Sequence, residues 1–226
     1  PSWPDRPAGD SLPLMSDPRT YLPPYPGLRV EEDRIVWKGR FPLQVVRFHH
    51  RRFDGEESGQ LTWELWRRGR AAALLPYDPV ADKVVLIEQF RLPVLAAGLD
   101  PIVTEIPAGL CNADETEDTT IRRELREEIG LDADVVVKIG QFVLTPGGCD
   151  ERITIFAGRV TAPTTGPDGI VGLTGLASEH EDIRVRVQDA TEVIEAAAAG
   201  AYPNSVCTIG LLWLGLKREE LRRTWR

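Results

Sequence analysis

Apolar and polar residues alternate in three segments near the start of the chain, RIVWKGR (34–40), FPLQVVRFHHRRF (41–53) and QLTWELWRRG (60–69). A period of two is typical of strands with one buried face. The turn-like sequence DGEESG at 54–59 separates the last two segments and predicts a hairpin. Residues 1–27 hold eight of the eighteen prolines, so we expect an irregular arm without a core of its own.

The middle of the chain is more continuously apolar. AAALLPYD (71–78) and KVVLIEQFRL (83–92) predict buried strands. Further strands are expected at IVTEIPAG (102–109), VVVKIGQFVL (135–144), RITIFAGRV (152–160) and IRVRVQ (183–188). A helix is predicted near 115–129, and a glycine-rich loop runs from about 163 to 182.

The end of the chain reads as helical, first in ATEVIEAAAAG (190–200) and then from Asn204 onward. The last helix is apolar in its first half and charged in its second, so we expect it to dock and then fray into solvent. The mixture of strands and helices predicts an α/β (α+β) layer architecture. The expected divisions are a proline-rich arm at 1–27, a small β domain at 28–67 and the main domain at 68–226.

Composition narrows the functional classes. A formal charge of −8 disfavours a general nucleic-acid or anionic-membrane surface, but a cation can still bridge acidic residues to a phosphate substrate. No apolar run is long enough to cross a bilayer, and no secretory signal is visible near the first residues. Cys111, Cys149 and Cys207 form no CxxC pair, which favours reduced thiols and a cytoplasmic protein.

The candidate chemistry lies between Gly109 and Leu131, in GLCNADETEDTTIRRELREEIGL. On a helix, Glu124 and Glu128 fall on one face with Glu127 beside them, next to an apolar stripe that includes Leu125. Grouped carboxylates repel one another unless a divalent cation lies between them, and oxygen ligands suit Mg²⁺ or Mn²⁺. The alternative is a solvated helix face with Arg–Glu pairs.

The full pattern of Gly109, Glu115 and the run from Arg123 to Leu131 resembles the signature of the Nudix hydrolase family. The resemblance implies a mixed sheet sandwiched between helices, preceded here by a small N-terminal antiparallel sheet. It implies Mg²⁺, replaceable by Mn²⁺, as the cofactor. The implied metal ligands are the Ala108 carbonyl, Glu124 and Glu128. Arg123 would pair with Glu127 and orient it, and Glu115 would brace the loop.

TEIPAGL, VVLIEQFR and TPGGCDER resemble the ADP-ribose pyrophosphatase branch, and Pro146 lies where that branch has a proline. GLASEHEDIRV (175–185) is similar to its mobile loop. By this likeness Glu179 would activate the attacking water and Glu181 would ligate metal. The implied reaction is hydrolysis of ADP-ribose to AMP and ribose 5-phosphate.

The same resemblance implies the residues that contact the substrate. Arg91 in EQFR is a candidate phosphate contact, because guanidinium offers a fixed fork of donors. Members of the branch are homodimers that exchange N-terminal sheets, which would bring Phe41 to a partner's site. The remaining expected contacts are Glu64, Arg68, Glu151 and, as a base contact, Trp63. Trp63 stands where an arginine is common and Arg40 where an aromatic is common, which puts the adenine preference in question.

Two alternatives stay open. One is a hydrolase of another nucleoside diphosphate sugar, such as a GDP- or UDP-hexose. The other is a non-catalytic nucleotide sensor, although such proteins commonly lose the acidic residues that this chain keeps at Glu124, Glu127 and Glu128.

Overall fold

The computed structural model describes residues 22–176, 178 and 180–225. The chain divides into two compact units, the first comprising residues up to Arg68 together with Gly147–Asp150 and the second comprising Gly69–Pro146 and Glu151–Arg226. Within the described ranges, no helix is long and apolar enough to cross a membrane.

The first unit is an antiparallel sheet of three strands in the order β1-β2-β3. The strands are β1 (Leu28–Lys38), β2 (Pro42–His50) and β3 (Leu61–Trp66), in agreement with the alternating segments of the sequence. Few of their side chains are buried, and Trp37 is 66% exposed. This sheet therefore buries little apolar surface of its own.

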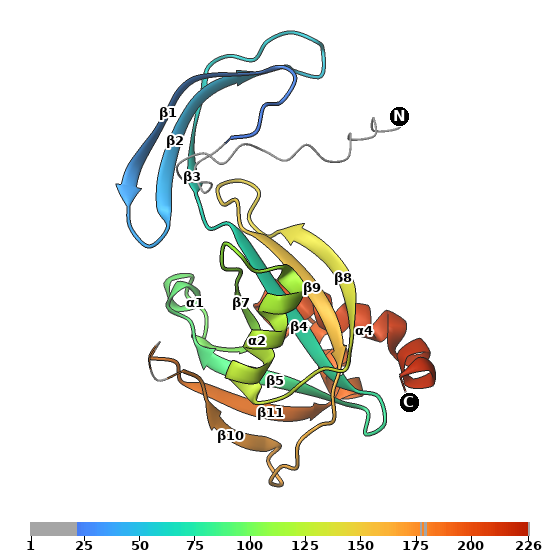
Figure 1. The fold of residues 1–226 in the computed structure, drawn as a ribbon. Helices are drawn as coiled ribbons and strands as arrows, with labels where there is room; N and C mark the ends of the chain where they lie inside the picture. The colour runs from blue at the N-terminus through green and yellow to red at the C-terminus, as the bar shows by residue number, and fades with distance from the viewer. Residues whose placement is uncertain (1–21, 177, 179, 226) are drawn as a thin grey trace. The chain divides into compact units, whose positions relative to one another are not determined.

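The second unit is built on a mixed eight-stranded sheet whose main path is β10-β11-β5-β4-β9-β8 (Figure 1). Its strands are β4 (Arg70–Asp78), β5 (Lys83–Phe90), β6 (Ile102–Glu105), β7 (Ala108–Leu110), β8 (Val135–Val143), β9 (Arg152–Arg159), β10 (Ile170–Thr174) and β11 (Ile183–Asp189). β4 and β9 run parallel, whereas the other pairings are antiparallel. β6 pairs with β5, and β7 pairs with β4.

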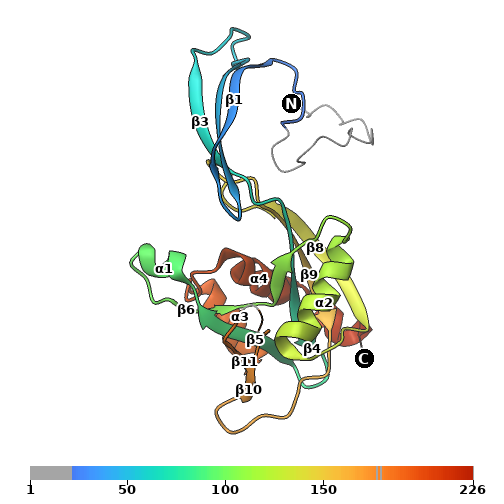
Figure 2. The same ribbon diagram turned by 60° about the vertical axis from the view of Figure 1, so that its left-hand side comes forward.

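Helices cover both faces of this sheet, as Figures 1 and 2 show, with α2 (Glu117–Ile129) on one side and α3 (Ala190–Ala198) and α4 (Ser205–Thr224) on the other. Alternate residues of β4 enter two separate cores. Leu75 and Tyr77 pack with Leu211 and Leu214 of α4, whereas Leu74 packs on the α2 side. Burial on both faces explains why β4 reads as a continuous apolar run. The predicted mixed sheet between helices is confirmed.

Several predicted boundaries were wrong. The expected strand at 83–92 ends at Phe90, and a short helix, α1 (Leu92–Ala96), follows. The segment 102–109 forms two strands, separated at Ile106–Pro107, rather than one. The expected loop at 163–182 contains β10, a strand whose glycine weakened its pattern.

The expected fraying of the last helix was also wrong. α4 continues to Thr224, and Leu221 and Trp225 lie in the core at 5% and 6% exposure. Arg218 and Arg222 pair with Asp82 in the turn between β4 and β5. The charged half of α4 is therefore amphipathic, with ion pairs on the side that faces the sheet.

Candidate active site

The helix α2 is fixed at both ends by local sequence. Thr116 caps its N-terminus, where its hydroxyl accepts from Thr119 N while the Thr119 hydroxyl donates back toward Thr116. Gly130 ends the helix in the left-handed region at φ 69°, which favours glycine. Between the caps, Ile121 and Leu125 are fully buried against the sheet. This packing sets which helix face is left for the carboxylates.

Two carboxylates of that face lie against β7. The backbone N–H of Ala108 donates to Glu128 Oε2 at 3.0 Å. Glu124 approaches the backbone of Gly109 so closely that a Cβ there would lie 1.7 Å from Glu124 Oε1. The glycine is therefore needed for the close approach of this side chain.

Arg123 is the centre of a charged network on the exposed side of the same helix. Its guanidinium donates to Glu115 at 2.9 Å and to both Glu124 and Glu127 at 2.8 Å. Glu115 also accepts from the backbone N–H of Asn112 at 3.1 Å. The Arg123 hydrogen bonds are the main reason that the pKa of Glu115 falls to about 2. The network holds the loop before α2 against the helix.

Glu128 is a buried acid, at 3% exposure. Burial, and then the negative charge of Glu124, raise the pKa of Glu128 to about 9, while the Ala108 N–H opposes the shift. Glu181 raises this pKa further and Arg91 lowers it. Burial also raises the pKa of Glu124, against the attraction of Arg123. Several carboxyl groups are thus gathered here without an equal number of positive charges, which favours their protonated forms until a cation binds.

These residues fit a hard divalent cation. The charge of Glu181 raises the pKa of both Glu124 and Glu128, so the three side chains lie near one another, and all offer carboxylate oxygens. Across the described chain, no three or more acidic, histidine or cysteine side chains form a cluster that could hold a metal ion. Mg²⁺ does not require one, because it keeps several waters and is held by one or two carboxylates plus substrate phosphates.

The loop after β10 borders this acidic group. Thr174 donates its hydroxyl to the Glu128 carbonyl at 2.5 Å, which ties the end of β10 to α2. Glu181 closes the loop by accepting from the backbone N–H of Leu176 at 3.0 Å. Glu179, the expected base, lies outside the described residues.

The expected substrate contacts are divided between the two units. Arg91 follows β5 in the second unit and Glu151 directly precedes β9 there. Phe41, Trp63, Glu64 and Arg68 belong to the first unit.

In the first unit, the Arg68 guanidinium lies 4.4 Å from the centre of the Phe41 ring and 4.7 Å from that of Trp66. Trp63 packs edge-on against Phe48 at 5.4 Å and is 48% exposed. Trp66 and Asp150 were missed by the sequence analysis, although Asp150 accepts from Arg67 Nε at 2.7 Å and Arg68 N at 2.6 Å. Trp66 directly precedes Arg67 in the sequence, whereas Asp150 lies within TPGGCDER, 83 positions after Arg67, so no local pattern indicated their contacts.

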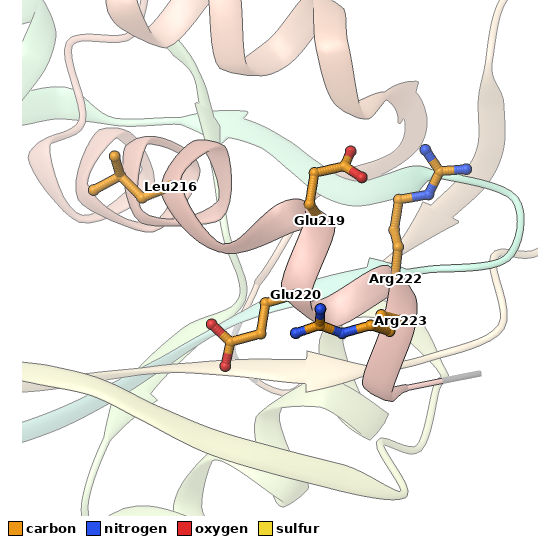
Figure 3. Close-up of a pocket in the computed structure, with 5 residues that line it drawn as sticks. All are labelled: Leu216, Glu219, Glu220, Arg222 and Arg223. Atoms are coloured by element: carbon orange, nitrogen blue, oxygen red, sulfur yellow. The ribbon is translucent and has the colours of Figure 1, made fainter.

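A surface hollow lies at the end of α4, lined by Leu216, Glu219, Glu220, Arg222 and Arg223 (Figure 3). Its helix covers the face of the sheet opposite to α2. Arg222 pairs with Asp82 at 3.3 Å, and Glu220 pairs with Lys217 at 2.9 Å. The hollow thus belongs to the packing of α4 and not to the acidic group.

A mixed sheet between helices, with an acidic helix packed against the glycine-containing strand β7, defines a domain of the Nudix type. Comparison with known proteins agrees, since the NUDIX domain family matches residues 67–204, and the chain belongs to this family.

Similarity to individual proteins covers more of the chain than the family match does. An ADP-ribose pyrophosphatase of Escherichia coli (strain K12) is 38% identical over 190 residues, 84% of this chain and 88% of the relative. A GDP-mannose pyrophosphatase of Salmonella arizonae is 32% identical over 170 residues, 75% of this chain and 85% of the relative. A crystal structure of an ADP compounds hydrolase superposes with a TM-score of 0.63 at 17% identity, over 87% of this chain and 95% of that one, which supports the fold.

Proposed function

We propose that this protein is a nucleoside diphosphate-sugar pyrophosphatase that hydrolyses ADP-ribose to AMP and ribose 5-phosphate. The observation that carries the proposal is the pair of carboxylates, Glu124 and Glu128, held against Ala108 and Gly109 at the edge of a Nudix sheet. The relatedness to ADP-ribose pyrophosphatases over most of the chain favours this substrate.

Glu124, Glu128, Glu181 and the Ala108 carbonyl are the proposed ligands of Mg²⁺, which Mn²⁺ can replace. When bound, the metal would neutralise charge on the diphosphate and polarise its phosphorus–oxygen bonds. Arg123 holds Glu127 at 2.8 Å and so fixes a further carboxylate beside the proposed ligands.

Glu179 is the proposed general base. It takes a proton from water as the water oxygen forms a bond to phosphorus, and the bridging P–O bond breaks to release the second phosphate monoester. Glu181, whose charge acts on Glu124 and Glu128, is only two positions after Glu179 in the sequence, which supports this role.

Arg91 and Glu151 are the proposed contacts of the second unit with the phosphates and ribose. Phe41, Trp63, Glu64 and Arg68 are those of the first unit. We also propose a cytoplasmic homodimer that exchanges the N-terminal sheets. The exposed apolar side chains of that sheet, including Val36 and Trp37, support an unsatisfied surface that association would cover.

A second candidate substrate is a GDP-sugar, favoured by the relatedness to GDP-mannose pyrophosphatases and by Trp63 at a position where arginine is common. The test is purified protein with Mg²⁺ against ADP-ribose, GDP-mannose and a UDP-hexose, with products identified by mass. AMP and ribose 5-phosphate should form fastest, and chelation should stop the reaction. Inactivity toward every diphosphate with Mg²⁺ or Mn²⁺ would overturn the proposal and favour a sensor.

A further inference from the structure

A buried carboxylate outside the Nudix motif accepts hydrogen bonds from three side chains. Glu105, at the end of β6, has a side chain only 8% exposed. Its Oε2 accepts from Gln89 at 2.9 Å and from Arg91 at 2.9 Å (Nε) and 2.6 Å (Nη2). Its Oε1 accepts from Asn204 Nδ2 at 2.6 Å. Both carboxylate oxygens of Glu105 are therefore hydrogen-bonded, and these bonds fix the orientation of the side chain.

Asn204 is itself held firmly. It caps the N-terminus of α4, where its Oδ1 accepts from the backbone N–H of Cys207 at 2.9 Å. An amide whose oxygen is bound to a helix end has one orientation, so its nitrogen must point at Glu105. The longest helix of the second unit thus anchors the carboxylate that holds Arg91.

The Arg91 guanidinium is hydrogen-bonded along one edge and exposed along the other. Its backbone N–H donates to the Pro101 carbonyl at 2.8 Å, and its Nε and Nη2 face Glu105. Nη1 has no hydrogen-bonding partner among the described residues, and the side chain is 42% exposed. Glu105, which holds Arg91, lies three residues before Ala108, whose backbone N–H donates to Glu128 at 3.0 Å, so the same short segment of chain meets both Arg91 and the acidic group.

We propose that Glu105, oriented by Asn204, is a positioning residue that presents the free edge of Arg91 to the substrate's diphosphate. This inference rests on the proposed function. A guanidinium on a flexible stem loses rotamer entropy when it binds an anion, and a carboxylate that has already fixed it removes that cost. Fixed placement also matters because small displacements of a binding group lower turnover strongly.

The first test compares Glu105→Gln and Asn204→Ser with the parent. Glutamine keeps the size of Glu105 but replaces one acceptor oxygen by an N–H₂ group, which cannot accept from the donors around it. Serine at position 204 can still cap α4 but removes the N–H₂ group that donates to Glu105. We expect kcat/KM to fall about tenfold to a hundredfold in Glu105→Gln, chiefly through KM, and less in Asn204→Ser. Glu88→Gln is the matched control, because Glu88 has a similarly covered side chain and pairs with Arg184 and Arg186 instead.

A second test separates positioning from folding. Arg91→Ala should lose activity that added guanidinium ion partly restores, because Glu105 still offers the vacated anionic site. The double variant Arg91→Ala with Glu105→Gln should not respond to guanidinium. Equal rescue by guanidinium in Arg91→Ala and in the double variant would overturn the inference. So would a kcat/KM that is the same in Glu105→Gln and Asn204→Ser as in Glu88→Gln. An inactive parent protein would instead refute the proposed function.

Discussion

The carboxylate of Glu124 occupies the space that a side chain at Gly109 would need, with Glu124 Oε1 1.7 Å from the position of such a Cβ. Because the obstructing atoms are the far end of a flexible side chain, an alanine at Gly109 should displace the carboxylate rather than unfold the domain. Gly109 thus controls the placement of a proposed metal ligand.

Gly109→Ala should therefore lower kcat about a hundredfold and weaken Mn²⁺ binding, since a displaced ligand no longer meets the cation. Its melting temperature in the absence of metal should stay close to that of the parent. Gly172→Ala serves as the control, because a Cβ at Gly172 meets nothing within 4 Å. Mn²⁺ titration by electron paramagnetic resonance gives the binding constants, and unchanged affinity in Gly109→Ala would contradict the proposed ligand.

Glu179→Gln should reduce turnover by ~10²–10⁴-fold, the usual contribution of a positioned proton acceptor. Mn²⁺ affinity should be nearly unchanged, because the proposed ligands remain. The measurement is kcat beside a metal titration of the same sample. Full activity would move the role of base elsewhere, with Glu127 as the next candidate.

Asp82 links three elements of the second unit. It accepts from the Tyr77 hydroxyl at 2.7 Å and from Arg218 Nε at 2.9 Å, and its backbone carbonyl accepts from Ala190 N at 3.1 Å. The Arg218 hydrogen bonds are the main reason that the pKa of Asp82 is lowered below its ordinary value, against the effect of burial.

A carboxyl whose pKa is lowered by folding stabilises the protein above its unfolded pKa of about 4, and that contribution is lost as pH falls through the folded value. Asp82→Asn should therefore lower the free energy of unfolding by ~1–2 kcal/mol at pH 7. The difference from the parent should shrink below about pH 4. Asparagine tolerates the left-handed backbone at this position, where φ is 58°.

Chemical denaturation from pH 7 down to pH 3 tests this, with Glu220→Gln as the control because its pair with Lys217 is exposed. A stability difference that does not change with pH would show that the Asp82 charge is not the cause.

Trp225 should be essential to the stability of the second unit although it lies one residue past the last helix. It is 6% exposed in the core, and its carbonyl accepts from Arg159 Nη1 at 2.8 Å. Trp225→Ala should cost about 3 kcal/mol by leaving a cavity. Leu216→Ala, on the same helix and 85% exposed, should cost little, and thermal melts of the two variants compare them directly. Equal melting temperatures would be inconsistent with this packing.

The parts of the fold that follow from local sequence were predictable. The glutamate spacing and Gly130 predicted α2 and its acidic edge, and the apolar run of β4 predicted a strand covered on both faces. The helix α1 was missed because a five-residue helix has almost no periodicity, although Pro93 in its first turn was a usable signal.

Other parts depend on contacts between distant residues and gave no local pattern. Arg218 looked like a solvated charge because its partner Asp82 lies 136 positions earlier. Likewise Arg91 was recognisable as a phosphate contact, but nothing near it in sequence indicated Glu105, or Asn204 at 99 positions from Glu105. Tertiary packing decided these pairings.

The loop Gly147–Asp150 folds with the first unit although the chain on either side belongs to the second. It exchanges backbone hydrogen bonds with Trp66, at 2.8 Å through Gly148 O and at 3.2 Å through Asp150 N. In a chain trimmed to begin at Gly69, the carbonyl of Gly148, the N–H of Asp150 and the Asp150 carboxylate would lose these hydrogen-bonding partners. A change of length in either segment would therefore disturb the backbone hydrogen bonds of the other, so the small sheet and this loop behave as one structural unit.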